Sequence, residues 1–166
     1  MSSGVSGVSV EFDPPRSSKP ALAFLKDYWD KKRGSRPMPS RADISPAEMK
    51  PFIRAIVLVD ALPDLTDFRY RMIGSDVTEH MLGDATGKTL REAFARYGQD
   101  ATEGAIAGYA HVARNKVVMR LHGSAEWLHQ PHLDFDSIHL PLSEDGKTVN
   151  MILSAVVFEP TAGVKS

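Results

Sequence analysis

The stretch HLDFDSIHLPLSEDGKTVNMILSAVVFEP, which spans residues 132–160, decides the class of the fold. It holds two segments that predict strands, HLDFDSIHLPL over 132–142 and KTVNMILSAVVFEP over 147–160. Between the segments lies SEDG, a typical turn sequence in which Gly146 can adopt a positive φ. The stretch therefore predicts a β-hairpin made of two antiparallel strands.

Three more strands and several helices are expected before this hairpin. The apolar run AIVLVDAL, which starts at Ala55, predicts a buried strand, and FRYRMIG, which starts at Phe68, predicts its hairpin partner. KVVMRLHG, which starts at Lys116, predicts the strand before the C-terminal hairpin. Short helical pieces and a longer helix, which ends near Arg114, separate these two groups of strands. We expect an α+β domain whose five-stranded antiparallel sheet carries helices on one face.

An amphipathic helix that ends before Gly34 is expected ahead of the first strand. Leu22, Leu25 and Trp29 lie on one stripe of this helix, with Tyr28 beside them. The helix must bury this stripe, and we expect it to cover part of the second face of the sheet. Because the apolar arc is wider than one contact needs, these four residues are also candidates for a homodimer interface.

The chain of 166 residues is long enough for one domain with its own core. We expect a single domain over residues 18–160. The flanking segments 1–17 and 161–166 are expected to be flexible tails, since the first is rich in Ser, Gly and Pro. The start lacks the basic and apolar regions of a secretory signal, and no apolar run approaches the ~20 residues that span a bilayer. A cytoplasmic protein without membrane insertion is therefore expected.

The composition excludes several classes of function. The net charge of −1 gives no overall field that would attract the chain to nucleic acid. The chain has no Cys, which excludes disulfides, thiolate metal sites, Cys nucleophiles and the cysteinyl adduct of light-sensing flavin domains. It also contains no G-x-S-x-G, Gly-rich phosphate loop or H-E-x-x-H motif. We therefore assign no catalytic residue and no metal ligand.

A basic connector follows the N-terminal helix. Arg33, Arg36 and Arg41 lie within nine residues and are spaced by Gly and Pro. Such a segment can present guanidinium groups to an anion or to a partner protein. In the alternative interpretation, Arg41 pairs locally with Asp43, and the prolines stiffen a connector between the helix and the first strand. The sequence leaves both interpretations open.

Three stretches carry a resemblance to a known family: YW..KRG.R.MPSRADI.P.EMKPF from Tyr28, DFRYRMIGSDV from Asp67 and GDATGKTL from Gly83. Together with the order of elements over roughly residues 24–158, they resemble the PAS fold and one PAS-like family of small, often stand-alone bacterial proteins. The resemblance implies a sensor or adaptor domain in bacterial signalling, typically dimeric. It implies no single ligand, because PAS domains bind haem, flavin, organic acids, nucleotides or nothing.

Arg69 and Arg71 lie on one face of the strand that starts at Phe68. If this face lines a cavity, the two side chains can clamp an anionic ligand such as a metabolite or a nucleotide. If the face meets solvent or the N-terminal helix, they are expected to pair with acidic side chains, namely those of Asp27, Asp30 or Asp60. The two arginines are thus candidate ligand-binding residues whose role depends on where this face lies.

His111 is the haem candidate that the resemblance implies. It lies on the longer helix before the third strand, where haem-binding PAS domains carry their proximal His. Its neighbours Tyr109, Ala110 and Ala113 are also compatible with ordinary packing. No cofactor is therefore expected, and haem or another small ligand is the alternative.

The sequence leads to one functional hypothesis and one alternative. The first is a non-enzymatic sensor or adaptor in bacterial signal transduction, which acts in trans on signalling proteins such as kinases or their regulators and forms a homodimer. The alternative is a small-ligand sensor that binds an anionic metabolite, a nucleotide or haem in the PAS pocket. Neither hypothesis involves nucleic acid or insertion into a membrane.

Overall fold

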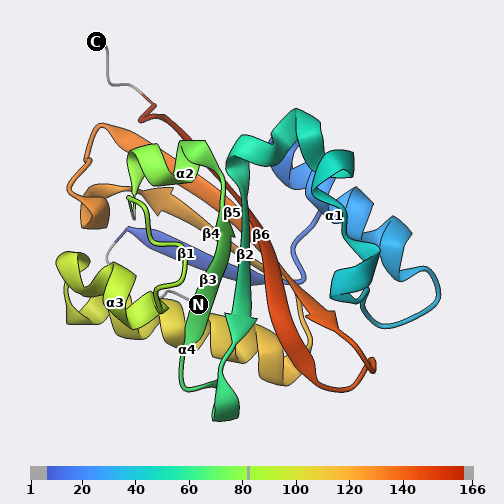
Figure 1. The fold of residues 1–166 in the computed structure, drawn as a ribbon. Coiled ribbons are helices and arrows are strands. Elements are labelled where there is room, and N and C mark those ends of the chain that lie inside the picture. Colours follow the sequence, from blue (N-terminus) through green and yellow to red (C-terminus); the bar gives the residue numbers. More distant parts are fainter. Residues whose placement is uncertain (1–6, 82, 163–166) are drawn as a thin grey trace.

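A six-stranded antiparallel sheet is the centre of the structure, a computed structural model that describes residues 7–81 and 83–162 (Figure 1). The strands follow the order β1-β4-β5-β6-β2-β3 across the sheet. Their bounds are β1 (Val8–Phe12), β2 (Ile56–Ala61), β3 (Phe68–Ile73), β4 (Met119–Ser124), β5 (Leu133–Ser143) and β6 (Val149–Pro160). The expected α+β class and antiparallel sheet are confirmed, with one strand more than predicted.

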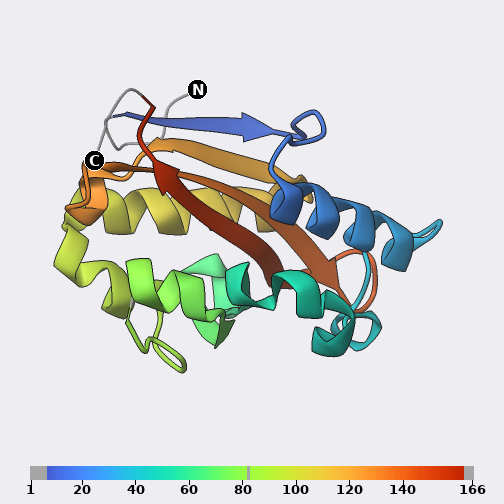
Figure 2. The same ribbon diagram turned by 90° about the horizontal axis from the view of Figure 1, so that it is seen from above.

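Helices pack on both faces of the sheet (Figure 2). The α-helices are α1 (Pro20–Arg33), α2 (Ser75–His80), α3 (Leu90–Phe94) and α4 (Gln99–Asn115). Short 3₁₀ segments are η1 (Arg41–Asp43), η2 (Pro46–Ala55), η3 (Pro63–Leu65), η4 (Ala95–Tyr97) and η5 (Glu126–Leu128). We name the face that contacts α4 the inner face and the face that contacts α1 the outer face. Within the described residues, none of the helices has the length and apolarity that crossing a membrane requires.

The β5–β6 hairpin closes through the turn that the sequence predicts. Gly146 has φ 75°, and its N–H donates to the hydroxyl of Ser143 at 2.9 Å. The carboxylate of Asp145 accepts the N–H groups of Lys147 and Thr148, each at 2.8 Å. These backbone hydrogen bonds hold the pKa of Asp145 down to about 2, because they stabilise its charged form. The turn thus fixes the register of the two longest strands.

The apolar stripe of α1 packs on the outer face of its own sheet. Leu22 and Leu25 are fully buried, and Tyr28 and Trp29 are buried beside them. The indole N–H of Trp29 donates to the carbonyl of Pro141 in β5 at 2.9 Å. This packing corrects the expectation that Leu22, Leu25, Tyr28 and Trp29 form a dimer interface. Their surface is already used within the chain, so it is not available to a partner.

β1 lies inside the segment 1–17, for which a flexible tail was expected. It pairs with β4 in antiparallel register, from Val8 opposite Gly123 to Phe12 opposite Met119. The sequence VSVEF alternates apolar and polar residues, and this period of two suits a strand at the edge of a sheet. The surrounding Ser, Gly and Pro residues concealed that pattern, so the tail assignment is wrong for 8–12. Residues 1–6 and 163–166 lie outside the described residues.

Candidate functional site

A cavity of about 350 Å³ lies between the inner face of the sheet and the helices. The six strands, together with α2, α3, η5 and the residue that follows α2, contribute most of its lining, which is mainly apolar: Val8, Val10, Phe12, Val57, Tyr70, Val77, Met81, Phe94, Met119, Leu121, Trp127, Phe135 and Val156. Cavities that hold small molecules in proteins typically have volumes of about 300–1,000 Å³ and predominantly apolar linings. The size and lining therefore fit a small-molecule site.

Small residues on α4 create the space for this cavity. Ala101, Gly104, Ala105 and Gly108 line it and recur every three or four positions, which places them on one face of the helix. A Cβ added at Gly108 would approach the flexible end of Met119 to 3.3 Å. Because this face carries almost no side-chain volume, the space between α4 and the sheet is not filled by side chains.

His139, Ser137 and Ser154 form a buried polar triad, of which His139 and Ser137 line the cavity. The Nε2 atom of His139 is 2.8 Å from the hydroxyl of Ser137, and its Nδ1 atom is 2.7 Å from that of Ser154. The ring of Tyr109 packs against the imidazole with centroids 4.9 Å apart. Burial lowers the pKa of His139 to about 3, because the charged form would lose its hydration. At neutral pH His139 is therefore uncharged, with one ring nitrogen donating and the other accepting.

The buried His139 predicts a pH dependence of stability. An unfolded His titrates near pH 6.5, whereas in the folded protein the pKa of His139 is about 3. Below pH 6.5 the unfolded chain binds a proton that the folded chain does not. The contribution of His139 should therefore lower the free energy of unfolding by up to about 1.4 kcal/mol per pH unit as the pH drops below about 6.5. Above about pH 6.5 this contribution should stay constant. Urea denaturation between about pH 7 and pH 5 measures the slope.

The variant His139→Gln is the control for this dependence, because Gln keeps polar groups but does not titrate. It should show a smaller loss of stability over the same pH interval. Equal slopes in the two proteins would show that folding does not lower the pKa of His139.

The tyrosines and a tryptophan add polar groups to the apolar lining. Burial raises the pKa of Tyr109 to about 12 and that of Tyr70 well above its usual value, so both hydroxyls stay neutral. The hydroxyl of Ser154 partly offsets the effect on Tyr109. The indole N–H of Trp127 is buried and has no hydrogen-bond partner among the described residues. A buried unpaired donor is costly, and a ligand that offers an acceptor there would remove this cost.

Sequence reasoning missed the polar triad. Ser137 and His139 alternate with Asp136 and Ile138 along β5, so a strand assignment already places both on one face. Two polar side chains on the same side of a largely apolar strand were the available signal. Ser154 could not be added to them, because its position opposite His139 depends on the register between β5 and β6.

The structure places Arg69 and Arg71 away from the cavity. Arg69 lies opposite Asp60 in the pairing of β2 with β3 and donates to the carbonyl of Gly87 at 2.8 Å. Arg71 donates to the carboxylate of Asp60 at 2.9 and 3.2 Å, and its side chain is 63% exposed. The alternating residues Phe68 and Tyr70 occupy the inner face instead. Arg69 and Arg71 therefore do not clamp a ligand in this cavity.

His111 does line the cavity, but it is exposed at the rim. Its ring packs on that of Phe12 in β1, with centroids 4.2 Å apart. The structure thus brings the haem candidate to the cavity, where its ring contacts the first strand.

The basic connector binds groups of its own chain. Each arginine has an intramolecular partner: Arg33 the carboxylate of Asp30 at 3.1 Å, Arg36 that of Asp43 at 2.9 Å, and Arg41 the carbonyl of Ile44 at 2.8 Å. Asp43 also accepts the backbone N–H of Ser40, as in a capping box. The pairing expected between Arg41 and Asp43 is therefore made by Arg36. Because Arg33 and Arg36 remain substantially exposed, the connector keeps some basic surface.

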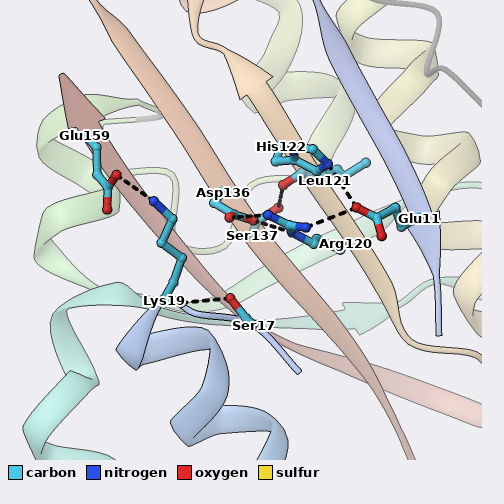
Figure 3. A network of polar contacts seen from close by, with 9 residues as sticks. All are labelled: Glu11, Ser17, Lys19, Arg120, Leu121, His122, Asp136, Ser137 and Glu159. Carbon is cyan, nitrogen blue, oxygen red and sulfur yellow. Dashed lines mark hydrogen bonds and ion pairs between the residues drawn. The ribbon is translucent and has the colours of Figure 1, made fainter. Parts of the chain in front are cut away.

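A cluster of ion pairs lies on the outer face, opposite the cavity (Figure 3). Arg120 of β4 donates to both carboxylate oxygens of Asp136 in β5, at 3.0 and 2.8 Å. It also donates to Glu11 of β1 at 3.0 Å, and the Nε2 atom of His122 is 3.0 Å from the same oxygen of Glu11. The side chain of Asp136 is only 6% exposed, so Arg120 is its essential partner. We name Glu11, Arg120, His122 and Asp136 the outer ion cluster.

The structure is an α+β domain in which an antiparallel sheet and the helices on its inner face border a ligand-sized apolar cavity. The chain belongs to the PAS domain family, whose model matches residues 17–157. This match confirms the resemblance seen in the sequence and supports a sensor or adaptor role in signalling. No curated protein and no solved structure shows a significant match to the chain. The matched region begins after β1, which therefore lies outside the match.

Proposed function

We propose that the protein is a ligand-binding sensor that holds a small, uncharged and largely apolar molecule in the inner cavity. The observation that carries this proposal is the apolar cavity of about 350 Å³ whose lining includes the neutral His139 and Ser137, with Ser154 hydrogen-bonded to His139. An apolar lining supplies affinity through burial, and a few placed polar groups supply orientation. The N–H of Trp127 adds a donor for a ligand acceptor such as a carbonyl or hydroxyl oxygen.

The charge of the lining favours a neutral ligand over the anionic metabolite or nucleotide considered from the sequence. Among the described residues, the lining includes no Arg, Lys, Asp or Glu. A buried charge without a partner is expensive, and the pKa of His139, about 3, means that this group supplies no positive charge at neutral pH. Arg69 and Arg71, which would have paired with an anion, lie outside the cavity.

We propose that the site is not catalytic. The contact between Ser137 and His139 looks like part of a nucleophile and base pair, but the second ring nitrogen meets Ser154 rather than a carboxylate. A His whose pKa is about 3 is a poor general base at neutral pH, because it holds a proton too weakly. The triad therefore serves binding and orientation.

We further propose that the sensor acts in trans on signalling proteins such as kinases or their regulators, as a homodimer in a bacterial cytoplasm. Membership of the PAS family supports a signalling role, and symmetric dimers are the commonest small assemblies. Phe24 of α1 and Phe52 of η2 are partly exposed apolar residues whose rings lie 4.9 Å apart. This pair replaces the buried stripe of α1 as the candidate contact.

The cavity can be tested by filling it. The variant Gly108→Leu adds a large side chain beside Met119, whereas Gly108→Ala adds a single methyl group and a similar gain in helix propensity. We expect Gly108→Leu to weaken binding of N-phenyl-1-naphthylamine, a neutral apolar fluorophore, by about tenfold or more, since the ligand space is lost. Gly108→Ala should bind nearly as the unmodified protein does. Fluorescence titration measures both affinities.

Equal affinity in the two variants would place the fluorophore elsewhere. Failure of the unmodified protein to bind it would contradict a cavity open to neutral apolar molecules. Native mass spectrometry of the freshly purified protein would then identify any molecule that is already bound.

A further inference from the structure

We propose that β1 is an access gate of the cavity: the strand leaves β4 to admit or release the ligand, and Glu11 helps to hold it closed. This inference concerns the regulation of the cavity and rests on the proposed function. Val8, Val10 and Phe12 point to the inner face and supply one wall of the cavity. The family match covers residues 17–157, so this wall is added to the PAS domain from outside it.

β1 is attached to the sheet along one side. It has five residues, lies at the edge of the sheet and, among the described residues, pairs with β4 alone. By contrast, β5 pairs with strands on both sides, and α4 is a helix of 17 residues that packs on the sheet and on α3. Of these three wall residues, Val8 is buried, whereas Val10 and Phe12 are partly exposed. Segments with little buried apolar surface open locally at low free-energy cost.

The outer ion cluster lets β1 leave without stranding a buried charge. Glu11 is the only member of the cluster on β1, and its side chain is 38% exposed. When Glu11 departs, Arg120 keeps both hydrogen bonds to the buried carboxylate of Asp136. Partly exposed ion pairs contribute little to stability, so the contacts of Glu11 favour the closed strand but do not fix it.

The two ends of β1 differ, which sets the direction of opening. At the C-terminal end, Asp13 donates its N–H to the carbonyl of Val118 at 2.7 Å and accepts the N–H of Val118 at 3.1 Å. At the N-terminal end, one hydrogen bond of 3.1 Å between described residues joins the N–H of Ser124 to the carbonyl of Gly7. There the strands approach closely, and a Cβ on Gly123 would overlap the carbonyl oxygen of Gly7. β1 therefore opens from Gly7 and pivots near Asp13.

A reversible crosslink tests the gate. Ser9 and His122 are direct partners in the antiparallel pairing, and the chain has no Cys of its own. The double variant Ser9→Cys with His122→Cys can therefore be locked by a single disulfide and released by a reductant. Stopped-flow fluorescence with N-phenyl-1-naphthylamine should give association and dissociation about tenfold or more slower in the oxidised than in the reduced protein. Equal rates, with the disulfide verified by mass, would overturn the gate.

The variant Gly123→Ala tests the gate in the opposite direction. The overlap with Gly7 should displace the start of β1, so the fluorophore should exchange several-fold faster and the amides of residues 8–12 should lose protection against hydrogen exchange. Gly146→Ala is the matched control: it also places a side chain at positive φ, but at the β5–β6 turn, where the nearest atom is 3.8 Å away. Fluorophore kinetics unchanged relative to Gly146→Ala would contradict the proposal.

The gate and the proposed function fail in different ways. Absence of fluorophore binding in the unmodified protein contradicts the proposed function. Hydrogen exchange needs no ligand: amides of β1 that are as protected as those of β5 would contradict the gate, whatever the cavity binds.

Discussion

The variant Trp29→Ala should lower the free energy of unfolding by about 3–5 kcal/mol, the range found when a packed aromatic residue is truncated. Trp29 is 6% exposed and connects α1 to the outer face, where its N–H donates to Pro141. Lys26 and Arg33 lie over its ring, with Nζ and Cζ 5.4 and 5.6 Å from the centroid. Truncation would remove these contacts and the hydrogen bond to Pro141. Denaturation in urea, followed by circular dichroism, measures the change.

The control for this variant is Phe24→Ala on the same helix. Phe24 is partly exposed, so its truncation should cost clearly less than that of Trp29. Similar denaturation midpoints for Trp29→Ala and the unmodified protein would show that α1 does not contribute its packing to stability.

The variant Arg120→Ala should destabilise the protein by about 3 kcal/mol or more, because it leaves the carboxylate of Asp136 buried without a cation. The side chain of Asp136 is 6% exposed, and that of Arg120 is 25% exposed. The comparison is Arg71→Ala, which removes a similar pair with Asp60 but from a side chain that is 63% exposed. That change should cost about 1 kcal/mol or less, since exposed ion pairs contribute little.

A double variant separates the two origins of this effect. Arg120→Ala combined with Asp136→Ala removes the stranded charge together with its partner, so it should recover much of the loss. If the double variant loses the sum of both single effects, the cost comes from lost packing and not from an unpaired carboxylate.

Local patterns were sufficient for most of the fold. The β5–β6 hairpin and the end of α1 before Gly34 follow from turn residues and apolar spacing, which act within a few positions of the chain. β1 escaped prediction because its five alternating residues stand among Ser, Gly and Pro, and only the unpaired edge of β4 makes them a strand. Edge pairing of this kind depends on a surface that is distant in the sequence.

The candidate site was harder to predict than the fold. Arg69 and Arg71 were candidate ligand-binding residues because they are charged, yet alternation along β3 turns them away from the inner face. The triad around His139 is formed by residues that look ordinary until β5 and β6 are in register. A cavity also arises where side-chain volume is missing. The small residues of α4 that create this space also occur in well-packed helices, so they do not predict a cavity by themselves.

The position of β1 has a further consequence for the solubility of the domain. At the opposite edge of the sheet, β3 is already covered by the segment around Lys88, whose carbonyl accepts the N–H of Tyr70. β1 provides the corresponding protection for β4. A chain trimmed to the family boundaries, residues 17–157, would bare the backbone hydrogen-bonding groups of β4 together with Met119 and Leu121. An exposed strand of this kind is a template for pairing between molecules, so β1 also lowers the tendency of the domain to aggregate.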